Sequence, residues 1–371
     1  MVLLLLLDAF RADYVECTPF LRYLAASGAS GRFQEPFGFA PRASYFGGVP
    51  PGQAGYSHLV WCDPEASPFR AARHYPDPRC LHPGGAAFVR EQVRKAAAAE
   101  TTPYAASYVH PLEIPFCFLP WFDVPEKYPP WDARCGYLSL FHEMHRAGRK
   151  WLYAGWPALS ELGLRGDGRI VSWVLEHARP EHDLVHVQFC ELDAVAHVSG
   201  PESGEVLRCL GETDRLARIL VEGLARLGGT QHLIVFGDHG MVPVVVQVDL
   251  QAGLEKLEAK APEDLVYFLD STGARFWYVC ESARSELREW LRGIAGGRLL
   301  SAAELEHYGM QVADWRNGED YWLADPGVLI VPNFFHSRDA PPRGMHGYAP
   351  EEPDNQGVFI AAGPSIPCGG R

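Results

Sequence analysis

Six acidic and imidazole side chains have the types and spacing expected of a metal-dependent enzyme. They are Asp8, Asp193, His197, Asp238, His239 and His346. The i,i+4 spacing of Asp193 and His197 places both side chains on one face of a helix, while Asp238 and His239 are adjacent in "FGDHGM". Each residue alone has an ordinary structural interpretation, such as a helix cap or a turn. Together, three carboxylates and three imidazoles form a ligand set for two compact metal sites.

The ligand types indicate which metal and which substrate the site accepts. Imidazole favours Zn²⁺, with Mn²⁺ as second choice, whereas Ca²⁺ and Mg²⁺ prefer shells made almost entirely of oxygen. Two divalent cations carry more charge than three carboxylates neutralise, and a phosphoryl group would complete the balance. Paired metals stabilise the attacking and leaving oxygens of an in-line displacement. We therefore expect two zinc ions and a small phosphate-containing substrate.

Three apolar segments position these carboxylates. "VLLLLLDAF", "DLVHVQFCELD" and "HLIVFGDHGM" each predict a buried strand with an Asp at or beyond its carboxyl end, which is where open α/β sheets bind ligands. Helical patterns lie between them in "PFLRYLAASG", with Gly28 as C-cap, in "GRIVSWVLEHA" and in "EVLRCLGETDRLARILVEGLARLGG". The alternation predicts an α/β fold with a mostly parallel sheet flanked by helices.

The length of 371 residues is consistent with a single domain, 1–371, that carries two insertions. The segments from about 64 to 135 and from about 243 to 335 interrupt the strand–helix rhythm, and the first is rich in Pro, Trp, Tyr and His. We expect both insertions to shape a pocket above the sheet. The alternative is that they only cover the core.

Charge and apolar patterning argue against polymeric or membrane partners. The net charge of -13 disfavours nucleic acid and anionic membranes. The opening apolar run, Val2 to Leu7, is short, has no preceding basic region and is followed at once by Asp8. Nine cysteines without a CxxC pair indicate reduced thiols. We therefore expect a cytoplasmic protein.

The motifs resemble those of the alkaline phosphatase superfamily, and most closely its type I phosphodiesterase/nucleotide pyrophosphatase family. The similar segments are "LDAFRADY", "TPFLRYLAASG", "ELDAVAHVSGPES", "FGDHGM" and "MHGYAPEEPDNQGVFIAAGP". The resemblance implies that Asp193, His197 and His346 hold one metal, and that Asp8, Asp238 and His239 hold the other. It also implies a Thr or Ser nucleophile beside the second metal, at the N-terminus of a helix.

The sequence departs from this family at the nucleophile. In "EPFGFAPRASYFGG", counting back from "GGVPP" places Gly38 at the nucleophile position, and glycine has no side chain that attacks. A sulfatase-type motif would align its Arg with Arg42, although a sulfatase also requires Cys or Ser at position 38. Arg42 is a candidate for binding a phosphoryl oxygen, or else a member of a structural ion pair.

Three interpretations of the missing nucleophile remain open. In the first, no covalent intermediate forms, and a water activated by zinc or a second substrate attacks directly. In the second, Ser44 is the nucleophile, although on a continuous helix it lies roughly 9 Å beyond Gly38. In the third, the protein binds metals and a ligand without turnover. His58, His110 and His142 are further candidates for acids or substrate contacts, or are ordinary core and surface histidines.

The function that these observations favour is a two-metal hydrolase or transferase acting on a phosphodiester, a pyrophosphate or another phosphate ester. The alternative is a catalytically inactive member of the same superfamily that binds metals and a ligand.

Overall fold

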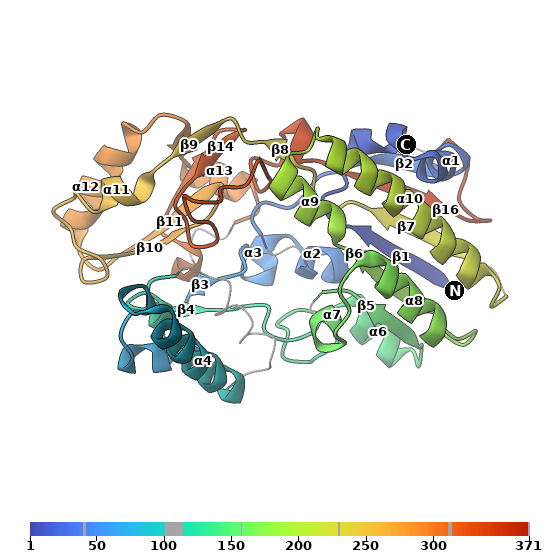
Figure 1. Ribbon diagram of the computed structural model, residues 1–371, viewed down its shortest axis with the longest axis horizontal. Helices are drawn as coiled ribbons and strands as arrows, with labels where there is room; N and C mark the ends of the chain where they lie inside the picture. The colour runs from blue at the N-terminus through green and yellow to red at the C-terminus, as the bar shows by residue number, and fades with distance from the viewer. Residues whose placement is uncertain (40–41, 101–113, 157, 229–230, 311–313, 370–371) are drawn as a thin grey trace. The chain divides into compact units, whose positions relative to one another are not determined.

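The computed structural model describes residues 1–39, 42–100, 114–156, 158–228, 231–310 and 314–369. The chain divides into two compact units, each assembled from segments that are distant in sequence (Figure 1). Met1–Glu35, Leu140–Val244 and Pro342–Arg371 form the first unit, and Pro36–Ser139 and Val245–Pro341 form the second. The second unit thus contains all of the first predicted insertion and nearly all of the second.

A six-stranded sheet organises the first unit, in the order β2-β16-β7-β1-β6-β5. Strands β5, β6, β1 and β7 run parallel, whereas β16 pairs antiparallel with both β7 and β2. This confirms the predicted mostly parallel sheet. The strands are β1 Val2–Leu7, β2 Ala29–Phe33, β5 Trp151–Ala154, β6 Leu184–Phe189, β7 His232–Phe236 and β16 Gly357–Ala362, with a separate antiparallel pair formed by β8 Val242–Pro243 and β15 Gly344–Met345.

The leucine run of β1 lies at the centre of this sheet because it has no polar side chain to place in water. Leu5 and Leu7 are fully buried, at 0% and 1% exposure. A parallel strand with neighbours on both sides and helices over the sheet is buried and therefore mostly apolar. Strands β6 and β7 are also mostly apolar, although β6 includes Gln188 and the fully buried His186, and the three strands predicted from sequence are all present.

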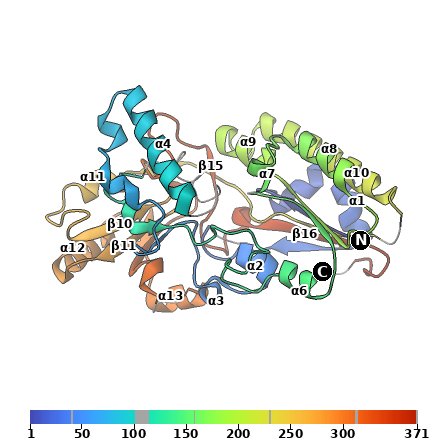
Figure 2. The ribbon, with the colours of Figure 1, turned by 90° about the horizontal axis from the view of Figure 1, so that it is seen from below.

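Helices cover the sheet, as expected. Those of the first unit are α1 Pro19–Ser27, α6 Leu140–Arg146, α7 Ala158–Glu161, α8 Asp167–His177, α9 Glu191–Ser199 and α10 Gly204–Ala225. Helices α8, α9 and α10 lie together along one face of the sheet, with α6 on the opposite side (Figure 2). Helix α1 begins at Pro19 and ends at Ser27, with Gly28 as its C-cap, and its first free N–H groups donate to the Asp214 carboxylate of α10. The cap therefore ties α1 to α10.

The second unit is built on a four-stranded antiparallel sheet, in the order β10-β11-β13-β12. The strands of this sheet are β10 Leu265–Leu269, β11 Gly273–Tyr278, β12 Gly297–Leu299 and β13 Asp320–Ala324. Two separate strand pairs are formed by β3 Trp61–Cys62 with β4 Phe122–Asp123 and by β9 Val246–Val248 with β14 Val328–Ile330. The helices of this unit are α2 Arg42–Gly47, α3 Pro51–Ala54, α4 Pro83–Glu100, α11 Leu250–Leu254, α12 Glu281–Arg292 and α13 Ala302–His307. The unit has an apolar core of its own, in which Trp322 and Phe276 are fully buried.

Two features of the chain as a whole bear on the sequence-based expectations. All nine cysteines are free thiols. Within the described ranges, no helix is both long and apolar enough to span a membrane.

Candidate metal centre

The three predicted carboxylates gather at one edge of the first unit because their strands run parallel and in register. Leu7 at the end of β1 is opposite Phe189 of β6, and Leu6 is opposite Phe236 of β7. The segments that follow therefore leave the sheet side by side at its carboxyl edge. Asp8 follows β1 directly, Asp238 follows β7 after one glycine, and Asp193 lies in the first turn of α9 beyond β6.

The backbone turns sharply after Asp8. Ala9 has φ of 57°, which is the one positive φ among the non-glycine residues that the structure describes. Such a conformation costs about 1–2 kcal/mol in an L-residue. The turn directs the Ala9 N–H to Asp238 Oδ1 at 3.3 Å, and the His239 N–H donates to the same oxygen at 3.1 Å. Backbone strain at Ala9 therefore accompanies the orientation of the Asp238 carboxylate.

Two imidazoles present the same ring nitrogen to these carboxylates. His239 Nδ1 donates to the Gly240 carbonyl at 2.8 Å, and its Nε2 lies 3.3 Å from Asp8 Oδ1 and 3.8 Å from Asp238 Oδ1. Likewise, His197 Nδ1 donates to the Gly344 carbonyl at 2.8 Å, and its Nε2 lies 3.2 Å from Asp193 Oδ1. A backbone acceptor on Nδ1 fixes the tautomer that leaves Nε2 available as a metal ligand.

His346 lies directly after β15, in the C-terminal segment of the chain. Its ring stacks on that of His239 at 3.6 Å between centroids and 6° between planes, and lies 5.3 Å from the ring of His197. Its Nε2 is 4.0 Å from Asp193 Oδ1. All six residues selected from the sequence are thus brought together in one unit.

Ligand atoms cluster in two groups of three, each with its atoms within 4.8 Å of one another. One group contains Asp193, His239 and His346, and the other contains Asp8, Asp238 and His239. His239 belongs to both, so the two groups adjoin. The first group thus has His239 where the resemblance implied His197, which is in neither group although its Nε2 lies 3.2 Å from Asp193 Oδ1.

The buried charges at this edge shift one another's pKa values. Burial raises the pKa of Asp8, and the charge of Asp193 raises it further. Burial and the charge of Asp8 raise the pKa of Asp238 to about 7. Burial alone would lower the pKa of His239, but the charge of Asp238 and the hydrogen bond with Asp8 hold it well above its usual value. Carboxylates crowded in this way favour any cation that enters, whether a proton or a metal.

Two further residues of the site carry no sequence signal that selects them. Gln188, near the end of β6, donates to Asp8 Oδ2 at 2.9 Å and accepts from the Trp156 N–H at 2.8 Å. Glu35 is buried at 4% exposure and accepts from Asn355 Nδ2 at 3.2 Å. Burial raises the pKa of Glu35 to about 8, with the charge of His239 opposing and that of Asp238 adding to the increase. The position of Gln188 near the end of a predicted strand does not by itself select it.

The predicted nucleophile loop belongs to the second unit, where Gly38 has no room for a side chain. Its φ is 103°, and a Cβ built on it would lie 1.9 Å from the Ser57 carbonyl oxygen. That oxygen accepts the Phe39 N–H at 2.8 Å. The space beside Gly38 is therefore filled by the backbone of residue 57.

Arg42 and Ser44 both have partners within this unit. Arg42 Nε donates to Glu126 Oε2 at 2.5 Å, and its Nη2 donates to the Glu126 carbonyl at 3.0 Å. The two side chains are 9% and 3% exposed, so this is a buried ion pair, as in the structural alternative considered for Arg42. Ser44 Oγ donates to the Val49 carbonyl at 2.7 Å, just beyond the end of α2.

The three candidate histidines differ in setting. His58 is buried at 1% exposure, with Nδ1 2.6 Å from Ser57 Oγ and Nε2 3.2 Å from the Tyr321 hydroxyl. Burial, and then the charge of Arg275, lower its pKa well below the usual value, so the ring is neutral. His142 lies in α6 of the first unit, and His110 falls outside the described residues.

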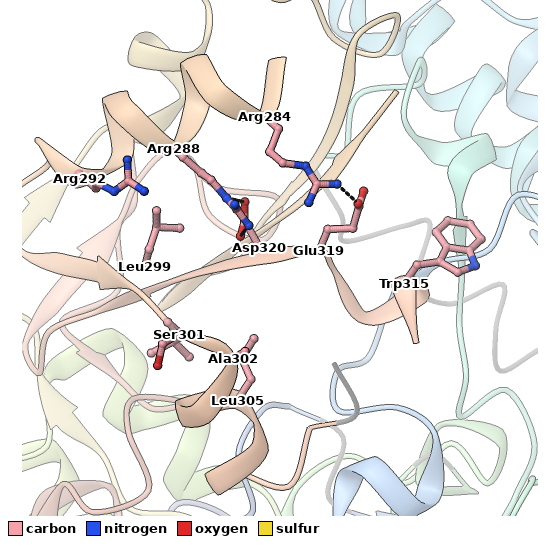
Figure 3. Close-up of a pocket in the computed structure, with 11 residues that line it drawn as sticks. Arg284, Arg288, Arg292, Leu299, Ser301, Ala302, Leu305, Trp315, Glu319 and Asp320 are labelled. Atoms are coloured by element: carbon pink, nitrogen blue, oxygen red, sulfur yellow. Dashed lines mark hydrogen bonds and ion pairs between the residues drawn. The ribbon is translucent and has the colours of Figure 1, made fainter. Parts of the chain in front are cut away.

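A groove in the second unit lies between α12 and α13. Three arginines of α12 line it, and two of them contact acidic residues at the start of β13 (Figure 3). Arg288 forms a two-point ion pair with Asp320 at 2.7 and 2.8 Å, and Arg284 pairs with Glu319. These pairs neutralise much of the local positive charge. Among the described residues that line the groove, no three metal-ligating side chains lie close together.

Comparison with known proteins identifies relatives for most of this chain. The family model described as type I phosphodiesterase / nucleotide pyrophosphatase matches residues 2–349. A protein of Schizosaccharomyces pombe, described as an uncharacterized pyrophosphatase/phosphodiesterase, is 25% identical over 206 residues, which are 53% of this chain and 42% of that protein. A venom phosphodiesterase of Macrovipera lebetinus is 26% identical over 214 residues, covering 53% of this chain and 24% of the venom protein. The matches thus span less than half the length of these relatives.

Solved structures show the same fold. Murine ectonucleotide pyrophosphatase / phosphodiesterase 5 superposes with a TM-score of 0.67 at 18% identity, covering 98% of this chain and 88% of the murine chain. An inactive variant of that murine protein, solved in complex with AMP, gives a TM-score of 0.65 at 18% identity and covers 97% and 87% of the two chains. These likenesses support the alkaline-phosphatase-like α/β fold expected from the sequence.

Proposed function

Because the chain belongs to the type I phosphodiesterase / nucleotide pyrophosphatase family, we propose that it is a metal-dependent hydrolase or transferase of phosphate esters. The single observation that carries the proposal is the convergence of Asp8, Asp238 and His239 with Asp193, His197 and His346 at one sheet edge. Phosphodiesters and pyrophosphates are the first substrates to test. A nucleotide is the leading choice, since an inactive variant of one structural relative was solved with AMP.

The donor set fits two zinc ions. Asp193, His197 and His346 would hold one ion, and Asp8, Asp238 and His239 would hold the other. The match to the metal is one of chemistry: imidazole Nε2 atoms and carboxylate oxygens face one another, and the Nδ1 atoms of His197 and His239 are already engaged by carbonyls. Mn²⁺ is the second choice. When bound, such ions stabilise charge on phosphoryl oxygens and lower the pKa of water.

Positioning is the part of the mechanism that the chain's own residues supply. The carboxylate of Asp238 is held by the N–H groups of Ala9 and His239, and that of Asp8 by Gln188. Ligands held in this way reorganise little when charge develops in the transition state. Gln188 also links Asp8 to the backbone of Trp156, so the loop after β5 is tied to the site.

We propose that the attacking group comes from water or from the hydroxyl of a second substrate. Gly38 offers no side chain, and the Ser57 carbonyl occupies the space where one would be. The hydroxyl of Ser44 donates to a carbonyl of its own unit. We accordingly assign Arg42 to the stability of the second unit, because Glu126 engages it in a buried ion pair.

The test is hydrolysis of bis-p-nitrophenyl phosphate and of a nucleotide panel with added Zn²⁺ or Mn²⁺. We expect Asp238→Ala and His346→Ala to abolish turnover. His177→Ala is the matched control, since His177 is an exposed histidine at the end of α8 in the same unit. Equal activity in wild type, Asp238→Ala and His346→Ala would refute the assignment.

A second candidate is a protein that binds metals and a phosphate-bearing ligand without turnover, which the glycine at position 38 favours. Isothermal titration with AMP and Zn²⁺, followed by analysis of the recovered ligand, separates the two candidates. AMP bound with zinc, combined with no turnover of any diester or pyrophosphate tested, would favour this candidate over the enzyme. Turnover that depends on Asp238 would eliminate it.

A further inference from the structure

Helix α9 carries Asp193 and His197 but has no cap from its own sequence. Its N-cap residue is Cys190, which makes no side-chain capping bond. The free N–H groups at the start of a helix need acceptors when they are buried. Asp167, the first residue of α8, supplies them: its Oδ1 accepts from the Cys190 N–H at 2.9 Å and its Oδ2 from the Glu191 N–H at 3.4 Å.

The interaction is reciprocal. Glu191, the first residue of α9, accepts the Asp167 N–H through Oε2 at 3.0 Å. Each helix start is therefore capped by a carboxylate from the other. Asp167 is only 2% exposed, so water does not replace it as an acceptor for these groups. The starts of α8 and α9 are consequently fixed against each other.

The far end of α9 is held by different contacts. The Arg343 N–H donates to the His197 carbonyl at 2.7 Å, and His197 Nδ1 bonds the Gly344 carbonyl. Asp193 lies in the first turn, next to the Asp167 cap. Two sets of contacts at opposite ends thus orient the two metal-facing side chains of one short helix.

We propose that Asp167 is a positioning residue that sets the direction of Asp193 by capping α9 from α8. The proposal rests on the metal-binding role proposed above for Asp193. It does not make Asp167 a ligand, because its oxygens are engaged by backbone N–H groups. Loss of the cap should weaken mainly the binding of the ion held by Asp193, His197 and His346, because Asp8 and Asp238 follow other strands.

The experiment measures zinc bound per chain and zinc affinity in wild type, Asp167→Ala and Asp167→Asn. Each protein is dialysed into buffers of fixed free Zn²⁺ and analysed by mass spectrometry for metal content. Co²⁺ substitution reports ligand geometry by visible absorption, without any assay of activity. We expect Asp167→Ala to bind one of its two ions about 10–100-fold more weakly, the usual effect of removing a group that orients a ligand. Asn keeps one acceptor oxygen, so Asp167→Asn should recover part of this affinity.

Asp214→Ala is the matched control. Asp214 is also a buried aspartate that caps a helix from another element, accepting the N–H groups of Phe20 and Leu21 at 3.0 and 2.9 Å, but α1 carries no proposed ligand. The Asp214→Ala variant should have a lower unfolding temperature than wild type and should still bind both ions. Equal zinc affinities in wild type and Asp167→Ala, or an equal loss in Asp214→Ala, would overturn the positioning role alone. Wild type that binds no zinc would overturn the proposed function as well.

Discussion

The most decisive perturbation is a side chain at position 38. Gly38→Ala places a methyl group in backbone with φ of 103°, a region that costs a non-glycine residue about 1–3 kcal/mol. The new Cβ would also lie 1.9 Å from the Ser57 oxygen, far inside van der Waals contact. Relief requires the two backbone segments to separate, which endangers the hydrogen bond from the Phe39 N–H to Ser57.

The magnitude follows from these two terms. Overpacking of a well-filled site costs about 1–3 kcal/mol beyond the conformational strain. We therefore expect Gly38→Ala to lower the free energy of unfolding by about 2–6 kcal/mol, which is a large share of the 5–15 kcal/mol typical of a folded domain. Gly55→Ala is the control in the same unit: φ there is 86°, but no heavy atom lies within 4 Å of the added Cβ. That variant should lose only about 1–2 kcal/mol.

Urea unfolding of both variants measures the difference, with a change in midpoint at constant slope as the signature of altered stability. Gly38→Thr extends the test to catalysis, because it introduces a residue type that the resemblance to the family implies for the nucleophile. We expect it to be at least as unstable as Gly38→Ala and no more active on bis-p-nitrophenyl phosphate. The argument would be refuted if Gly38→Ala were as stable as Gly55→Ala, or if Gly38→Thr raised kcat.

Three further outcomes are expected. Arg42→Ala should destabilise the protein by about 3–5 kcal/mol in urea unfolding, because Glu126 is left buried without its partner. The control is Arg215→Ala, which breaks an exposed ion pair. An equally small change of the unfolding midpoint in both variants would contradict the prediction. Ser44→Ala should retain full turnover, and its free energy of unfolding should fall by about 1 kcal/mol because one hydrogen bond is lost. Loss of turnover in a folded Ser44→Ala protein would instead support Ser44 as the nucleophile. Burial, opposed by the Arg275 charge, raises the pKa of Asp270 from 3.8 to about 6, so its protonated form is favoured in the folded state. Relative to Asp270→Asn, the free energy of unfolding of the wild type should therefore be highest below pH 4 and should fall by about 3 kcal/mol as the pH rises through 6. If the free energies of unfolding of the two proteins changed in parallel with pH, this effect would be excluded.

Much of the candidate site was predictable because it depends on local patterns. An apolar run followed by a carboxylate places Asp8 and Asp238 at strand ends, and parallel strands bring those ends together. The i,i+4 spacing of Asp193 and His197 fixes a shared helix face without any tertiary contact. These inferences require only the periodicity of strands and helices. The assignment of Gly38 to the nucleophile position is different in kind, because it is what the resemblance to the family implies.

Tertiary structure decided the features that join segments distant in the chain. It stacked His346 on His239, placed Glu126 against Arg42, and brought the Ser57 carbonyl beside Gly38. It also supplied Asp167 as the cap of α9, where the sequence shows only an aspartate at the start of another helix. No local pattern encodes such pairings, because hydrophobic burial and backbone hydrogen bonding across the whole fold select which segments meet. The sequence by itself therefore determined which candidate ligands the proposed site has, and the packing of distant segments determined how they are held and why position 38 has no room for a side chain.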